Sequence, residues 1–302
     1  MMNRKKFIKT SIGIAGVSMV SPTVLAKSTK TSLQQKPQIK KSLKYSMVKE
    51  ELSIEEKFRM LKDLGFDGVE MDSPNELNNS EIIVARDKSG LEIPGVINSV
   101  HWKSPLSHPD AAVRKACFDS MVTALNDCKE YGGTTVLLVP GVVSADISYE
   151  DAYIRSQNEI RKLIPYAEKT GIKIAIENVW NNYLISPLEA ARYLDEINSP
   201  MVGWYFDIGN IVRYGWPEHW IRTLNKRILK LDVKEYSREK QRNEGVWKGF
   251  DVELAEGDCN WPVVIEALTD IGYSGWASAE VPGGDRKRLE KISLLMDKIF
   301  KV

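Results

Sequence analysis

Four carboxylate residues stand near the ends of four consecutive candidate strands in the second half of the chain: Glu177, Asp207, Asp232 and Glu280. Side chains alternate along a strand, so each carboxylate shares a face with the residue two positions before it. If those faces point into one space, four negative charges converge there and repel one another unless a cation neutralises them. A ligand set made only of oxygens favours Mn²⁺ or Mg²⁺ over softer metals. The pattern therefore predicts one divalent metal held by these four residues.

Each carboxylate has a plainer interpretation when it is considered alone. An Asp or Glu at the end of a strand is often a solvated loop residue or the N-cap of the next helix. The repetition on four strands in a row is what favours a metal site over four unrelated polar residues.

The elements that must position these residues alternate regularly from residue 43 onward. The predicted strands are 43–48, 67–72, 93–101, 134–140, 173–179, 202–208, 228–235 and 275–281. Several helical segments between them end at a glycine, such as Gly65 or Gly171, which suits the left-handed position that closes a helix. Eight such units predict a parallel sheet with right-handed crossovers. We expect it to close into a single-domain (β/α)8 TIM barrel over residues 43–302.

The alternative fold is a doubly wound open sheet. That fold normally carries a Gly-rich phosphate turn after its first strand, and Val48-Lys49-Glu50 contains no glycine. A barrel typically needs about 250 residues, and the chain has 302. Barrel enzymes react at the C-terminal ends of their strands, which is where the four carboxylates stand.

The first 26 residues have the order of an export signal peptide. Basic residues from Arg4 to Lys9 precede an apolar run at 11–20, and Val24 and Ala26 supply small residues before a cleavage site. Ten apolar residues are too few to span a bilayer, so we expect no membrane span in the mature protein. Residues 27–42 are polar and predict a flexible linker. The mature protein is then expected in the periplasm or outside the cell. The basic run resembles a twin-arginine signal with lysine as its second residue, which leaves the Sec route open.

Charge and cysteine content narrow the function classes. The 42 basic and 41 acidic residues give a formal net charge of +1, whereas a nucleic-acid surface would be strongly basic. Three scattered cysteines are too few for a disulfide framework or a Cys-rich zinc site. We therefore expect a small-molecule partner and no nucleic acid.

Three short strings around the carboxylates resemble a known family. They are A-I-E-N at 175–178, F-D-I-G-N at 206–210 and S-A-E-V at 278–281. They are similar to the sugar isomerase and epimerase branch of the xylose-isomerase-like barrels, which includes D-tagatose 3-epimerase and hydroxypyruvate isomerase. The likeness spans residues 43 to about 300. It implies that Glu177, Asp207, position 232 and Glu280 ligate one divalent metal, and that Glu177 and Glu280 also shuttle protons.

The chain departs from this family at two positions. Asp232 stands where the family usually has a ligating histidine, which makes the site harder and more negative, and Asn210 replaces a substrate-binding histidine of the tagatose epimerase type. Arg238 matches a substrate-binding arginine of the family. The same superfamily contains endonucleases for abasic DNA, but their trinuclear zinc site needs several histidines, and this chain has three in total.

The predicted reaction is proton transfer through a metal-bound enediolate of an unphosphorylated sugar or keto-sugar. The predicted substrate contacts are His101, Trp102, Asn210, Lys234 and Arg238. Epimerisation and isomerisation use the same groups, and so does elimination from a 3-keto-glycoside by a lyase or hydratase. A non-catalytic sugar-binding barrel in the periplasm is the alternative of a different class. The sequence leaves homo-oligomerisation open.

Overall fold

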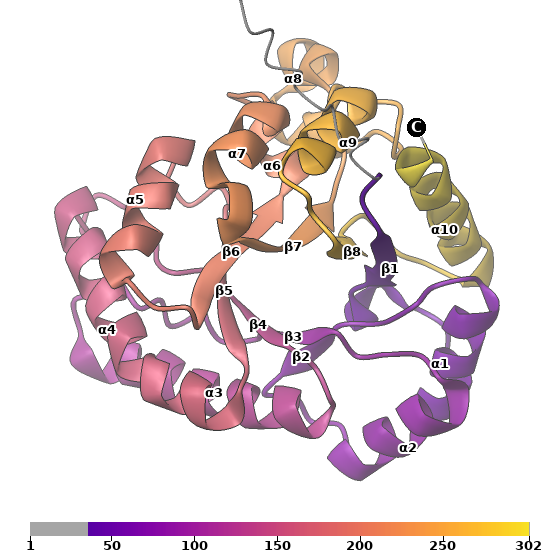
Figure 1. Ribbon diagram of the computed structural model, residues 1–302, viewed down its shortest axis with the longest axis horizontal. Coiled ribbons are helices and arrows are strands. Elements are labelled where there is room, and N and C mark those ends of the chain that lie inside the picture. Colours follow the sequence, from indigo (N-terminus) through magenta and orange to yellow (C-terminus); the bar gives the residue numbers. More distant parts are fainter. Residues whose placement is uncertain (1–35, 302) are drawn as a thin grey trace, which may run out of the picture. The chain divides into compact units, whose positions relative to one another are not determined.

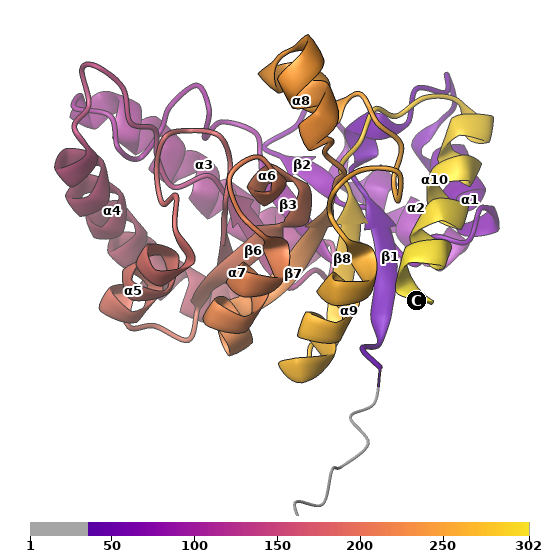
Figure 2. The same ribbon diagram turned by 90° about the horizontal axis from the view of Figure 1, so that it is seen from above.

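A computed structural model describes residues 36–301 of the chain. In it, an eight-stranded parallel sheet curls into a ring with helices on its outside (Figures 1 and 2). The strands are β1 (Ile39–Leu43), β2 (Met71–Ser73), β3 (Gly95–Asn98), β4 (Thr135–Leu138), β5 (Lys173–Glu177), β6 (Val202–Asp207), β7 (Ile228–Val233) and β8 (Gly275–Ala279).

The ring closes between β1 and β2. The strand order is β1-β8-β7-β6-β5-β4-β3-β2, and the two ends meet through a parallel bridge between Lys44 and Glu70. The Tyr45 amide donates to the Glu70 carbonyl at 2.8 Å, and the Glu70 amide donates to the Leu43 carbonyl at 2.9 Å. The predicted single-domain (β/α)8 TIM barrel is confirmed, and the doubly wound open sheet is excluded.

Helices follow the strands around the outside of the ring. They are α1 (Ile54–Asp63), α2 (Asn79–Ser89), α3 (Ala111–Glu130), α4 (Tyr149–Thr170), α5 (Pro187–Ile197), α6 (Ile208–Val212), α7 (Pro217–Leu224), α8 (Arg238–Glu244), α9 (Trp261–Asp270) and α10 (Arg286–Phe300), with 3-10 turns η1 (Tyr45–Met47), η2 (Asn225–Arg227) and η3 (Val246–Phe250). Gly90 and Gly171 close α2 and α4 in the left-handed conformation, as the sequence predicts. Figure 2 shows α8 standing on the side where the strands end.

The N-terminal boundary of the barrel differs from the prediction. The first strand is residues 39–43, so it begins four residues before the expected strand and lies mostly inside the expected linker at 27–42. The reason is Lys41, which looks like a linker residue but is buried, with its ammonium 2.7 Å from Asp297 of α10. The predicted export signal at 1–26 lies outside the described residues.

The interior of the ring differs from the layer between strands and helices. That outer layer is a continuous apolar core. Inside the ring, the buried apolar cluster consists only of Leu137, Ala175 and Tyr205 among the described residues. Partly buried Ile97 and Leu229 pack against it. Buried charged residues, among them Lys44, Glu70 and Lys230, share the interior of the ring.

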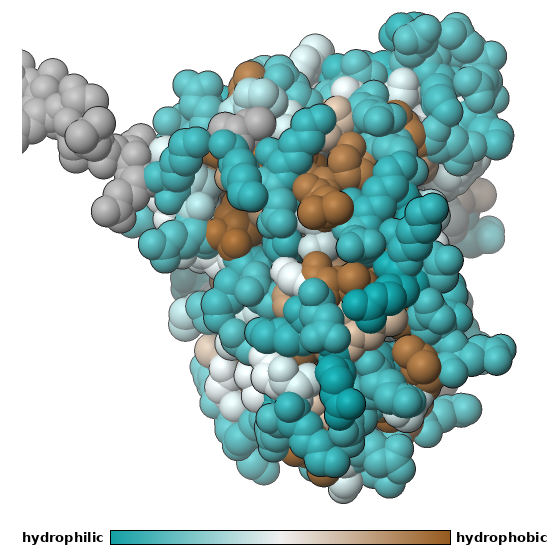
Figure 3. Space-filling model, turned by 90° about the vertical axis from the view of Figure 1, so that its right-hand side faces the viewer, coloured by the Kyte–Doolittle hydropathy of each residue, from teal (hydrophilic) through white to brown (hydrophobic). Residues whose placement is uncertain are grey.

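One side of the molecule shows how polar and apolar residues are distributed on the surface. On the face that Figure 3 shows, hydrophilic residues dominate and hydrophobic ones form separate small patches. Within the described part of the chain, no helix combines the length and the apolar character that crossing a membrane requires.

Candidate metal and active site

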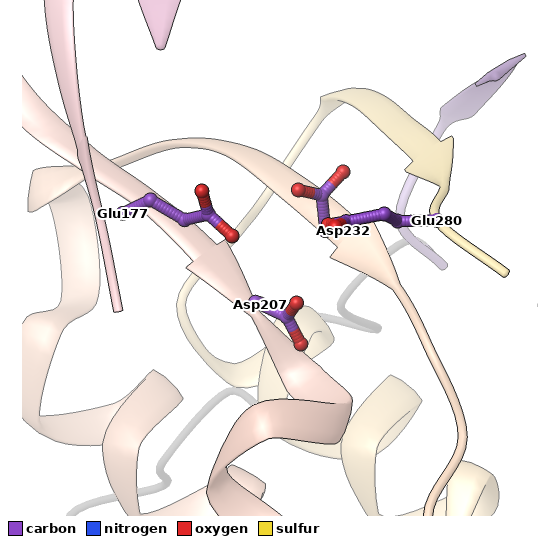
Figure 4. A group of neighbouring side chains, drawn as sticks. All are labelled: Glu177, Asp207, Asp232 and Glu280. Carbon is purple, nitrogen blue, oxygen red and sulfur yellow. The ribbon is translucent and has the colours of Figure 1, made fainter. Parts of the chain in front are cut away.

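The four carboxylates predicted to meet do meet. Glu177, Asp207, Asp232 and Glu280 each offer an oxygen, and these oxygens all lie within 4.8 Å of one another. Figure 4 shows Glu177 entering from one side and Asp232 with Glu280 from the other. They come from the ends of β5, β6 and β7 and from the residue after β8. Register explains the convergence, because Asp207 pairs with Asp232, which in turn pairs with Ser278, two residues before Glu280.

Asp207 is fixed by its backbone neighbours. Its Oδ1 accepts a hydrogen bond from the Asn210 amide at 2.8 Å, so it is the N-cap of α6. The Asn178 side chain holds the same residue from β5: its amide nitrogen donates to the Asp207 carbonyl at 2.8 Å, and its oxygen accepts from the Asp207 amide at 3.0 Å. These contacts leave Oδ2 to face the other carboxylates. Asp207 is therefore the cap of α6, and its second carboxylate oxygen lies in the cluster of carboxylates.

Two lysines partly balance the charge. The Lys234 ammonium lies 2.9 Å from Asp207 Oδ2 and 3.3 Å from Glu280 Oε1. The Lys44 ammonium lies 2.8 Å from Asp232 Oδ1. Four carboxylates against two ammonium groups leave two negative charges, which is the charge that one divalent cation neutralises.

Burial makes this excess charge costly. It raises the pKa of Glu177, Asp207 and Asp232, and the neighbouring carboxylates add to the rise for all three. For Glu280, burial is outweighed by the nearby Lys234 and Lys44, and its pKa is lowered. Asp207 Oδ2 and both oxygens of Asp232 are buried and receive no well-directed hydrogen bond from the described residues, although the first and Asp232 Oδ1 each lie against a lysine ammonium. Buried carboxylate oxygens without well-directed donors are suited to a hard divalent cation, so the residues present fit the predicted metal.

A cavity of about 460 Å³ opens above the carboxylates. That volume is within the usual range for small-molecule sites. The predicted substrate contacts His101, Trp102 and Lys234 all line it, together with Asp72 and Phe250.

His101 is neutral in this cavity. Burial lowers its pKa to about 4, and its Nδ1 accepts a hydrogen bond from the Val139 amide at 3.3 Å. The ring proton is therefore on Nε2, which can donate to a substrate oxygen. The Trp102 ring stands edge-on to His101, 5.8 Å between centroids, and is 54% exposed.

Two predicted substrate contacts do not line the cavity. Asn210 donates from its side-chain amide to the Asn178 carbonyl at 3.0 Å and so braces α6 against β5. The Arg238 guanidinium donates to the Val212 and Gly215 carbonyls at 2.9 and 2.7 Å, and it stacks over Trp216. It ties α8 to the loop after α6.

The structure adds residues that sequence reasoning missed. Lys44, Asp72 and Phe250 line the cavity. Glu235 lines it too and is buried, where it accepts hydrogen bonds from Trp261 Nε1 at 2.7 Å and from the backbone amides of Ala255 and Cys259. The only signal for Glu235 in the sequence is its position directly after Lys234. Nothing in the local sequence marks Lys44.

A family model described as a xylose isomerase-like TIM barrel matches residues 58–298. The chain belongs to this family. Two relatives of this xylose isomerase-like TIM barrel are L-ribulose-5-phosphate 3-epimerases. The chain is 24% identical over 233 residues to the one from Salmonella paratyphi A and 26% identical over 238 residues to the one from Shigella flexneri. Both matches cover 73% of this chain and 79% of the relative. The expected kinship with sugar isomerases and epimerases is confirmed, and these relatives support an enzyme of that class.

Solved structures of the same architecture include a 3-keto-D-glucoside 4-epimerase from E. coli. It has a TM-score of 0.74 and 16% identity, with 88% of this chain and all of that chain covered. A D-tagatose 3-epimerase-like protein has a TM-score of 0.73 and 21% identity, with 87% of this chain and 97% of that chain covered. At such identities the likeness establishes the fold.

Proposed function

We propose that this protein is a divalent-metal-dependent isomerase or epimerase of an unphosphorylated sugar or keto-sugar. The observation that carries the proposal is the meeting of four carboxylates from β5 to β8 within 4.8 Å beside a cavity of about 460 Å³. Mn²⁺ or Mg²⁺ suits this all-oxygen set. Held by these four residues, such a cation would supply Lewis-acid polarisation of a substrate carbonyl and would lower the cost of enolisation beside it.

The proton transfers fall to Glu177 and Glu280. They come from β5 and from the end of β8, so they border the cavity from different sides. One carboxylate takes the proton from the carbon beside the carbonyl, and the electron pair of that bond moves into the enediolate. Return of a proton to the opposite face of the same carbon gives an epimer, whereas its return to the neighbouring carbon gives an isomer. The Nε2 proton of His101 is placed to hold a substrate oxygen.

The cavity is suited to a substrate without a phosphate group. Within the described part of the chain, its lining holds no arginine, and its two lysines, Lys44 and Lys234, are already paired with carboxylates. Phosphate groups are usually bound by arginine forks, unpaired lysines or helix N-termini. The phosphorylated substrate named for the Salmonella and Shigella relatives is therefore not expected to be the substrate here.

Proton exchange tests the proposal. Keto-sugars and 3-keto-glycosides are incubated in D₂O with the protein and Mn²⁺, and deuterium incorporation is followed by NMR. We expect deuterium at the carbon beside the carbonyl of at least one sugar, and no exchange after removal of the metal with a chelator. Loss of a leaving group with formation of an unsaturated ketone would identify a lyase on the same site. Absence of exchange and turnover across the panel would favour a sugar-binding barrel instead.

A further inference from the structure

Lys44 is a buried lysine that the reaction described above does not use. It follows β1 directly, and its side chain is 6% exposed. Its ammonium lies 2.8 Å from Asp232 Oδ1 and 3.0 Å from Glu70 Oε2, and it donates to the Tyr205 hydroxyl at 3.3 Å. The side chains of Asp232 and Glu70 are also buried, at 0% and 1% exposed.

These contacts belong to a chain of alternating charges inside the barrel. Below Lys44, Glu70 contacts the ammonium of Lys230 at 3.2 Å and accepts a hydrogen bond from the Tyr205 hydroxyl at 2.7 Å. Gly95 leaves the room for Lys230, because a Cβ there would lie 2.6 Å from the lysine nitrogen. The order Asp232, Lys44, Glu70, Lys230 has no net charge. Asp232 is the end of this chain that reaches the candidate metal site.

The two oxygens of Asp232 differ in their surroundings. Both are buried and receive no well-directed hydrogen bond from the described residues, but Oδ1 forms an ion pair with the Lys44 ammonium at 2.8 Å, and no ion pair to Oδ2 is found among those residues. A buried charge is tolerated when it is paired, and a ligand is held in place when its second polar atom is engaged by a neighbour. Lys44 pairs with the charge of Asp232 and engages its Oδ1, which leaves Oδ2 available to a metal ion.

We propose that Lys44 is a positioning residue of the metal site: it balances the charge of Asp232 and holds Oδ1, so that Asp232 can serve as the fourth metal ligand. This inference rests on the proposed metal dependence. Of the four carboxylates, Lys44 contacts only Asp232, and its other ion pair, with Glu70, is shared with Lys230. The contact of Lys44 therefore supports the metal mainly while position 232 carries a charge.

A double-mutant cycle on Mn²⁺ binding tests this dependence. Calorimetry on the metal-free full chain compares wild type, Lys44→Met, Asp232→Asn and the double variant. Loss of such a supporting contact typically weakens metal binding about 10- to 100-fold. We expect Lys44→Met to raise the Kd of Mn²⁺ in that range in the wild-type background, and by less than about threefold in the Asp232→Asn background.

Lys230→Met is the matched control, because it removes the other ammonium on Glu70 without touching Asp232. We expect it to change the Kd of Mn²⁺ by the same factor in both backgrounds. Lys44→Gln replaces Lys44→Met in the cycle if circular dichroism shows that the latter does not fold.

Equal effects of Lys44→Met in the two backgrounds, or no effect in either, would overturn the role of Lys44. In both cases wild type still binds Mn²⁺, so the proposed function survives. A wild-type protein that binds no Mn²⁺ overturns both proposals.

Discussion

Glu177 and Glu280 have opposite electrostatic surroundings although they share one site. Burial and the charges of Glu280 and Asp207 raise the pKa of Glu177, whereas Lys234 and Lys44 outweigh burial and lower that of Glu280. Two carboxylates whose pKa values are pushed apart are suited to different steps of a proton transfer. This difference between their pKa shifts supports the proposal that one glutamate removes the proton and the other returns it.

Replacing either glutamate by glutamine should separate metal binding from turnover. Glutamine keeps an oxygen for the metal but cannot accept a proton from carbon. We expect Glu177→Gln and Glu280→Gln to retain bound metal and to lose about 10²- to 10⁴-fold in turnover. Steady-state kinetics, elemental analysis and D₂O exchange check this. Turnover within about threefold of wild type in one variant would remove that residue from the mechanism.

His101 should make stability depend on pH in a defined window. Its pKa is lowered by burial from 6.5 to about 4, so between these values the unfolded chain binds the proton that the folded chain refuses. Stability is therefore lost as pH falls from about 6.5 towards 4, by up to roughly 3 kcal/mol.

Urea unfolding of wild type and His101→Gln across this range isolates the effect. We expect the difference in unfolding free energy between the two proteins to shift in favour of the variant as the pH is lowered. A difference that stays constant between pH 7 and pH 4 would show that His101 is not held neutral.

At the scale of elements, the segment between β7 and α9 is anchored in part by the buried carboxylate of Glu235. Glu235 accepts from Trp261 Nε1, Ala255 and Cys259, and a Cβ at Gly257 would lie 2.6 Å from its Oε1. Glu235→Gln should place an amide donor against these donors and cost about 1–3 kcal/mol. Thermal unfolding and proteolysis of the loop at 251–260 measure the loss.

Glu239→Gln on α8 is the matched control, because Glu239 is exposed. We expect it to change stability by less than about 0.5 kcal/mol. Equal stability of the two variants would show that Glu235 does not hold the loop.

Strands β5 to β8 were predictable because the local sequence of each agrees with its place in the fold. The predicted strand at 173–179 contains β5, and 228–235 contains β7. The isoleucines of β5 follow the clear end of α4 at Gly171. The period of two predicted the inward face correctly, because Ala175 and Tyr205 are in the barrel interior. The carboxylates at these strand ends were found for the same reason.

What the sequence did not reveal depends on contacts between distant residues. The strand β1 reads as a polar segment because the partner of Lys41 is Asp297, at the other end of the chain. Lys44 is 188 positions from Asp232, so their pairing has no local pattern. Arg238 was predicted to contact substrate, and only the fold shows that its guanidinium donates to backbone carbonyls after α6 instead.

At the scale of the whole molecule, the export prediction concerns the part of the chain before the barrel. The order of basic, apolar and small residues in 1–26 leads us to propose an exported protein that begins near Lys27. N-terminal sequencing of natively expressed protein from separated cell fractions checks this. Recovery of an intact Met1 or Met2 from the cytoplasmic fraction would contradict it.

The metal content of wild type and two Asp207 variants tests the central claim most directly. Asp207→Ala removes a ligand, while Asp207→Asn keeps an oxygen to cap α6 and removes only the charge. We expect elemental analysis and Mn²⁺ titration to find one divalent metal per wild-type chain. Asp207→Ala should hold none, and Asp207→Asn should hold it much more weakly, with circular dichroism unchanged in both. A wild-type protein without stoichiometric metal, or an Asp207→Ala variant with the wild-type content, would contradict the account.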